Sequence, residues 1–102
     1  MNTNDKETLS KKVVEGVKLL DENFPGWETY INLESLKLEN TSQCILGQLY
    51  GDYSIGVSNL EVPMNIYYFG PKYGFSPLLN RTEEWECLTD LWTEVIFSRT
   101  ET

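Results

Sequence analysis

Cysteines and adjacent carboxylates are the residues in this sequence that could carry out covalent or acid–base chemistry. Cys44 stands near the predicted start of a helix, where a thiol pKa can fall, but an apolar isoleucine follows it. The sequence contains no histidine that could activate a thiol as a general base. We therefore expect Cys44, and likewise Cys87 between an acid and a leucine, to be structural thiols.

Two pairs of adjacent acids, Asp21–Glu22 and Glu83–Glu84, could do acid–base work or hold Mg²⁺ if they met in a cleft. Neighbouring residues on a helix do not face each other, however, and both pairs fall at predicted helix ends. The sequence also has no glycine-rich phosphate loop and no metal-binding motif. It therefore predicts no catalytic, cofactor-binding or metal-binding residues, no cofactor and no enzymatic activity.

The charge of the chain excludes several classes of partner. Sixteen acids against eight bases give a formal net charge of −8. This charge repels phosphate backbones and anionic lipid, and no apolar run is long enough for a membrane span. We expect no direct binding of nucleic acid, no membrane insertion and a cytoplasmic location, the host cytoplasm if a phage encodes the protein.

Four acids form a stripe near the C-terminus: Glu83, Glu86, Asp90 and Glu94 follow the helical spacing i, i+3, i+7 and i+11. Residues 81–102 hold six acids and two bases, a net charge of −4 and half of the total. The stripe is either a solvated face or a docking face for lysine and arginine side chains. The leading hypothesis is a small acidic protein that binds and modulates or inhibits a host protein with a basic surface.

An aromatic segment supports an alternative hypothesis. Residues 66–75 could enclose a nucleotide-like small molecule, with Tyr67, Tyr68, Tyr73 and Phe75 as the binding residues. The competing interpretation is that these rings cover a small core. Lys72 and Arg81 are the bases nearest to them in the sequence, so an anionic nucleotide would find little countercharge.

Three segments have clear helical patterns. A first helix is expected from about Asp5 to the Phe24-Pro25-Gly26 stop. A short central helix within residues 42–53 would be capped by Thr41 or Ser42 and closed by Gly51. A final helix begins after a Thr82 cap and carries its acids in the first turn. The predicted core comprises Trp27, Leu46, Leu49, Trp85, Leu88 and Trp92.

The fold class predicted from these patterns is mainly α. We expect a small single domain over residues 1–102, with residues 1–4 frayed and three to four helices. Alternating apolar residues in 30–38 and 66–69 indicate a possible short β pair. Proline and glycine in 61–80 predict a long aromatic loop.

Several motifs resemble those of a family of short proteins encoded in bacterial genomes, especially actinobacterial ones, and in tailed phages. They are Leu19–Glu22, Pro25–Trp27, Ile31–Leu33 and Cys44–Gly51, followed by Tyr73–Phe75 and a last helix with tryptophan. The resemblance implies a phage or mobile-element origin, and small acidic phage proteins often bind and disable a host protein. It implies no activity and no site residue.

Overall fold

Helices make up all the regular structure in the part of the chain that the computed structural model describes, residues 4–77, 79 and 81–101. The α-helices are α1 (Asn4–Asn23), α2 (Ile45–Tyr50), α3 (Tyr53–Leu60), α4 (Ile66–Tyr73) and α5 (Thr82–Thr100), and a 3-10 turn, η1 (Trp27–Tyr30), follows α1. The mainly α prediction is confirmed, with five α-helices in place of the expected three to four.

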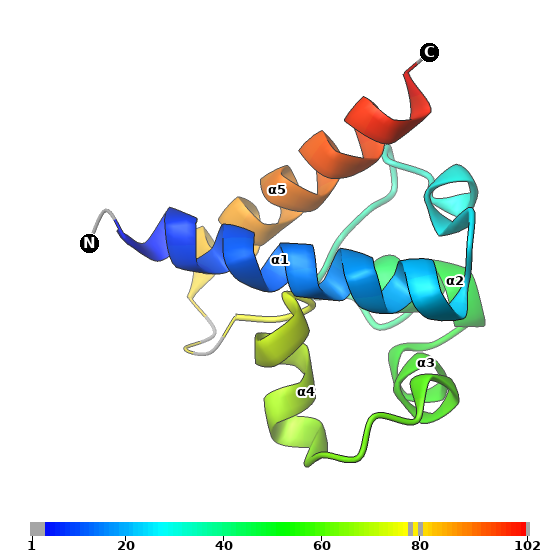
Figure 1. Cartoon of the computed structure of the whole chain (residues 1–102). Coiled ribbons are helices and arrows are strands. Elements are labelled where there is room, and N and C mark those ends of the chain that lie inside the picture. The colour runs from blue at the N-terminus through cyan, green and yellow to red at the C-terminus, as the bar shows by residue number, and fades with distance from the viewer. Residues whose placement is uncertain (1–3, 78, 80, 102) are drawn as a thin grey trace.

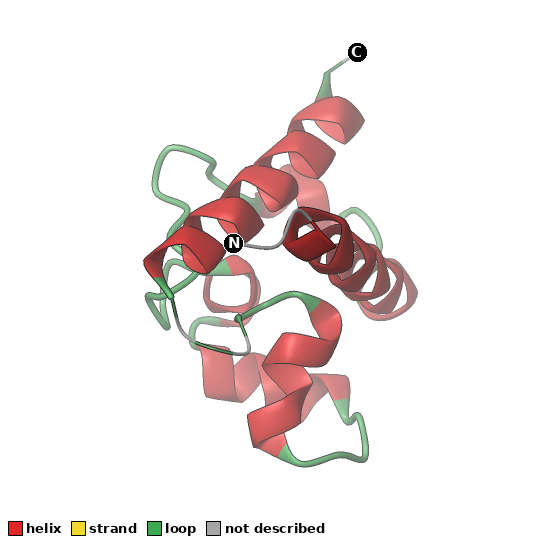
Figure 2. Cartoon of the chain, turned by 90° about the vertical axis from the view of Figure 1, so that its left-hand side faces the viewer, coloured by secondary structure: helices red, strands yellow, loops and turns green. Residues whose placement is uncertain are grey.

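Helix α1 crosses the molecule between α5 on one side and α4 on the other, and α2 packs against α3 (Figure 1). Figure 2, turned by 90°, shows the helices in red and the loops that connect them in green. The radius of gyration is 12.6 Å, close to the value of about 13 Å for a compact domain of 100 residues. The described chain therefore forms a single domain around α1.

The first helix follows its predicted pattern. Leu9, Val13 and Leu20 are buried, and α1 ends just before Pro25 and Gly26, where the glycine has a φ of 82°. Asn4, expected to be frayed, is the first residue of α1, and residues 1–3 lie outside the described part of the chain.

The central helix is shorter than predicted, and its cap is different. The thiol sulfur of Cys44 accepts the N–H of Gly47 at 3.2 Å, so Cys44 is the N-cap of α2. Thr41 and Ser42 do not cap the helix because they lie in the preceding turn, where the Asn40 side chain accepts the N–H of Ser42 at 2.9 Å. After Gly51, Asp52 caps a second helix, α3, by accepting the N–H of Ser54.

The expected β pair is absent from the described residues. Residues 31–44 form turns, and residues 66–69, predicted as a strand, belong to α4. Asn65 starts this helix by accepting the N–H of Tyr67 at 2.8 Å, and Gly74 ends it with a φ of 74°. The predicted aromatic loop therefore contains a helix, which continues through Pro71 at the loss of one backbone hydrogen bond.

The last helix carries Glu83 and Glu84 in its first turn, as predicted. Thr82 is its first residue and not its cap: Arg81 occupies the N-cap position and makes no side-chain capping bond. Near the other end, the Arg99 guanidinium donates to the Asp21 carboxylate at 2.8 Å, and the Trp27 indole N–H donates to the same carboxylate at 2.9 Å. These bonds join the C-terminal turns of α1 and α5 to η1.

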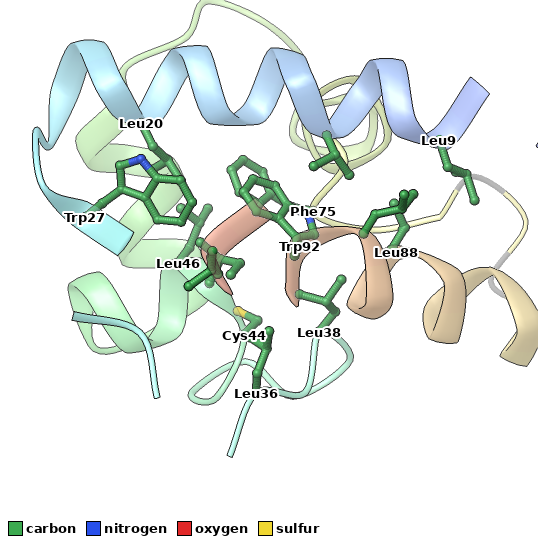
Figure 3. Close-up of a cluster of buried hydrophobic side chains, with 14 of the residues drawn as sticks. Leu9, Leu20, Trp27, Leu36, Leu38, Cys44, Leu46, Phe75, Leu88 and Trp92 are labelled. Carbon is green, nitrogen blue, oxygen red and sulfur yellow. The ribbon is translucent and has the colours of Figure 1, made fainter. Parts of the chain in front are cut away.

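Trp92 lies at the centre of the core, next to Trp27 and Phe75 (Figure 3). Its indole N–H donates to the Gly74 carbonyl at 2.7 Å, and its ring stacks on Phe75 at 5.3 Å between centroids. Four of the predicted core residues are fully buried: Trp27, Leu46, Leu88 and Trp92. Leu49 and Trp85 are only partly buried and pack against the outside of this cluster, because α2 turns one face alone toward the core and Trp85 lies at its edge.

Truncation of the two leucines of α2 tests this placement. Leu46→Ala should reduce the free energy of unfolding by about 2–5 kcal/mol, as is usual for a buried leucine. Leu49→Ala should cost about 1 kcal/mol because Leu49 is only partly buried. Denaturant unfolding of both variants measures the difference, and equal costs would contradict the burial of α2 described here.

Gly16 allows the close contact of α1 with the core. A Cβ at this position would meet the Tyr73 carbonyl oxygen and lie 2.9 Å from the Trp92 ring. Gly16→Ala should therefore destabilise the protein, although alanine is favoured over glycine by about 1 kcal/mol in an open helix. Val14→Ala, at an exposed position two residues earlier, is the control and should change the thermal midpoint little. A Gly16→Ala variant at least as stable as wild type would exclude this packing.

The Asp21 cluster makes stability depend on pH. Partial burial raises the pKa of Asp21, but hydrogen bonds from Arg99 and Trp27 outweigh it and hold the pKa below its ordinary value. The charged form therefore stabilises the fold above about pH 4, and this contribution is lost as the pH falls through the lowered pKa. Asp21→Asn keeps an acceptor oxygen but removes the charge, so its melting temperature should lie below that of wild type at neutral pH and approach it near pH 3. A difference that stays constant down to that pH would exclude the charge as its cause.

Candidate functional site

The four acids predicted to form a stripe share one surface of α5, which we call the acidic face: Glu83, Glu86, Asp90 and Glu94. All four are exposed, and the helical period places them opposite the buried Leu88 and Trp92. They line a depression of about 480 Å³ that Lys6 of α1 borders on its other side. The structure therefore brings all four residues together on a concave surface.

The electrostatics of the acidic face are unfavourable within the chain. Glu86, Asp90 and Glu94 follow each other at intervals of four residues, and like charges at this spacing destabilise a helix by about 0.2–0.5 kcal/mol per pair. Among the described residues, none of the four carboxylates forms an ion pair. Lys6 is the one base among the described residues that line this depression. Lys37 borders Glu86 and Asp90 from a neighbouring depression. Among the described lining residues, two lysines therefore stand beside four carboxylates, and a net negative charge remains.

A second depression, the aromatic pocket, also has a volume of about 480 Å³, within the range of ligand sites. Its lining combines the turn before α2, the starts of α3 and α4, the residues after α4 and the first turn of α5: Leu38, Glu39, Thr41, Cys44, Tyr53, Tyr67, Phe75, Ser76 and Trp85. Figure 3 shows Leu38 and Cys44 side by side at the edge of the core cluster.

The structure divides the four aromatic residues predicted to bind a ligand. Tyr67 and Phe75 line the aromatic pocket, whereas Tyr68 is exposed outside it. Tyr73 instead packs on Phe69 at 5.1 Å between ring centroids. Phe75 is 3% exposed and belongs mainly to the core. Of the two predicted residues that line the pocket, Tyr67 is therefore the accessible one.

Sequence reasoning missed the pocket residues Tyr53 and Trp85. The helical spacing within residues 42–53 places Tyr53 on the apolar face of the predicted central helix, and the spacing in the last helix places Trp85 in the predicted core. Their meeting with Glu39 joins three segments that are distant in the sequence, and no local spacing indicates such a contact. An aromatic residue at the edge of the apolar face of an amphipathic helix is a sequence signal that could have indicated Trp85.

The thiol and phenol groups in the walls of the aromatic pocket are neutral, and Glu39 is the charged residue among its described lining residues. Burial raises the pKa of the Cys44 thiol, although hydrogen bonds from backbone N–H groups partly oppose the rise. Burial also raises the pKa of Tyr53 to about 12, with a smaller contribution from Cys44. Both groups are therefore protonated near pH 7, and Glu39 supplies the formal charge of the lining. A protonated thiol is a weak nucleophile. Cys87 is partly buried.

A smaller depression of about 250 Å³ connects the two surfaces. It shares Glu39 and Trp85 with the aromatic pocket, and Glu86 and Asp90 with the acidic face. Lys37 and Thr89 are among its other lining residues. The three depressions form a continuous band around α5 that is apolar at one end and acidic at the other.

Two further features bear on the site. Within the described residues, no group of three or more cysteine, aspartate or glutamate side chains is placed to hold a metal ion. No helix in that part of the chain is both long enough and apolar enough to cross a lipid bilayer.

Comparison of the chain with protein-family models, with curated proteins and with solved structures gave no match. The resemblance to short bacterial and tailed-phage proteins stays a prediction from the sequence motifs.

Proposed function

We propose that this chain is a non-enzymatic binding protein that docks on a basic surface of another protein through the acidic face of α5. The observation that carries the proposal is the concentration of four exposed carboxylates in one depression, where none of them has an ion-pair partner and Lys6 is the one lysine among the described residues that line it. Lysine and arginine side chains of a partner would supply the missing countercharge.

Net charge supports the same mode of association. A chain with a formal charge of −8 attracts basic surfaces over several ångströms and repels nucleic acid and anionic lipid. Complementary charge mainly raises the association rate and selects the partner. An acidic surface on a helix suits a protein that covers a basic site of its partner and thereby modulates or inhibits that partner.

The biological setting follows from two lines of argument. The resemblance to tailed-phage proteins favours a phage or mobile-element protein with a host protein as its partner. The chain has two widely spaced cysteines and lacks the dense cysteine framework that is typical of small secreted domains, so we place the interaction in the host cytoplasm.

A small-molecule binder is the second candidate, favoured by the volume of the aromatic pocket. No lysine or arginine is among the described residues that line it, so the phosphates of a nucleotide would be unpaired. The lining suits a neutral or cationic ligand better than the nucleotide-like ligand that the aromatic residues first suggested.

Charge reversal on α5 tests the leading proposal. Glu86→Lys combined with Asp90→Lys should abolish or strongly weaken capture of partner proteins from a host lysate at low salt, because it turns attraction into repulsion. Both residues are exposed, so the thermal midpoint should change little. Pull-down with quantitative mass spectrometry, using wild type and the variant as baits, measures the change.

The matched control carries the same change in net charge elsewhere. Glu22→Lys with Glu34→Lys replaces two exposed acids that lie outside the acidic face and its depression. Partners captured by wild type and by this control, but not by the α5 variant, support the proposal. Equal capture by all three baits at low salt would refute docking through the acidic face.

A further inference from the structure

We propose that the aromatic pocket is the anchor site of this same interface, and that it receives a large apolar side chain from a basic segment of the partner. This inference rests on the proposed function, because it adds a specific recognition element to the acidic face. It identifies the partner by the combination of one apolar anchor with lysine or arginine residues close by in its sequence.

The continuity of the band is the first argument. Trp85 and Glu39 belong both to the aromatic pocket and to the connecting depression, which Glu86 and Asp90 share with the acidic face. A segment lying along the band would therefore contact an apolar cavity and then Glu39, Glu86 and Asp90, with Lys37 as the one base among the described residues of the connecting depression. Glu39 at the pocket itself places a negative charge next to the anchor.

The composition of the pocket is the second argument. Leucine, phenylalanine, tyrosine and tryptophan provide most of its walls, while Thr41 and Ser76 add neutral polar groups. Tyr67 at this pocket is 82% exposed, so a large ring is left in solvent where an apolar side chain could cover it. The pocket volume of about 480 Å³ accommodates even an aromatic side chain.

Charge decides between the possible occupants. A second copy of this chain would bring a further charge of −8 to an acidic surface. Nucleic acid would bring phosphates to a pocket whose described lining residues include no lysine or arginine. A basic peptide segment with one large apolar side chain would fill the apolar pocket and place positive charges beside the neighbouring carboxylates. Hot-spot anchoring by one apolar side chain, with charges around it, is a common arrangement at protein interfaces.

The helix geometry sets the spacing of the partner's residues. Trp85 is turned by about 100° from Glu86 and about 140° from Asp90 around α5, so the outer ends of these side chains can lie up to about one helix diameter, or 10 Å, apart. An extended segment advances about 3.3 Å per residue. The basic residues should therefore follow or precede the apolar anchor by about three residues.

A set of three synthetic peptides tests the inference against the ¹⁵N-labelled full chain by NMR titration. The first probe is acetyl-Ser-Phe-Ser-Ser-Lys-Lys-amide. The second replaces phenylalanine with alanine, and the third replaces both lysines with glutamine. At low salt and millimolar peptide, the first should bind about tenfold more tightly than either of the others, since burial of an aromatic ring and contact with the carboxylates each contribute. Its shift changes should include the Trp85 indole and the Tyr53 and Cys44 amides.

Tyr67→Ala and Tyr68→Ala provide a matched pair of protein variants. Both residues are exposed neighbours on α4, but only Tyr67 lines the aromatic pocket. Tyr67→Ala should weaken binding of the first peptide about tenfold, and Tyr68→Ala should leave it unchanged. Because both side chains are mostly exposed, neither variant should lose its fold.

The outcomes separate the failure of this inference from that of the proposed function. Equal binding of the phenylalanine and alanine peptides, reduced in both cases by Glu86→Lys with Asp90→Lys, would exclude the anchor and leave the acidic face as the docking surface. Equal binding of the lysine and glutamine peptides would show an apolar site indifferent to charge, which also overturns the inference and favours a small-molecule ligand. No shift with any peptide would overturn it as well.

Discussion

The packing of Trp92 is the constraint on which the rest of the structure depends. Its ring touches elements from the whole length of the chain: it lies edge-on to Trp27 of η1 at 5.7 Å and stacks on Phe75 after α4 at 5.3 Å. The indole N–H of Trp92 donates a hydrogen bond to the Gly74 carbonyl. Gly16 has no side chain, which lets α1 approach the Trp92 ring closely. Because Phe75 and Trp92 are held in this way, the aromatic pocket and the acidic face lie on fixed sides of α5. An interaction surface built on such a helix loses little conformational entropy on binding.

The sequence predicted the long helices well because their apolar residues recur at helical intervals. α1 and α5 were found with nearly correct bounds, since a proline–glycine stop and an acidic first turn mark their ends. The prediction failed between them. The aromatic run at 66–69 alternates as a strand would, but Asn65 caps it as a helix, and tertiary packing of Phe69 and Tyr73 decides the outcome. Cys44 as a cap was missed because cysteine is a rare capping residue, and the local pattern offered Thr41 and Ser42 instead.

The acidic face could be predicted because it lies within one continuous helix, where spacing alone places residues on a side. The aromatic pocket could not, because it is made by tertiary contacts among segments that begin at Leu38 and end at Trp85. Of the four aromatic residues that the sequence predicts to bind a ligand, Tyr67 and Phe75 line the pocket, and Phe75 is mainly a core residue. Tyr73 packs on Phe69 instead. The apolar aromatic pocket and the acidic face follow each other around α5. We therefore expect a partner with an apolar anchor and adjacent basic residues.

The central claim is that this band is where the partner docks, and carboxyl footprinting of the complex tests it most directly. A captured partner is purified with the chain, and carbodiimide labelling followed by mass spectrometry compares each carboxylate in the free and bound protein. The account predicts that Glu39, Glu86 and Asp90 lose reactivity on binding, whereas the exposed acids Glu15 and Glu22 of α1 stay as reactive as in the free chain. Unchanged labelling of the band, with protection on α1 instead, would contradict it.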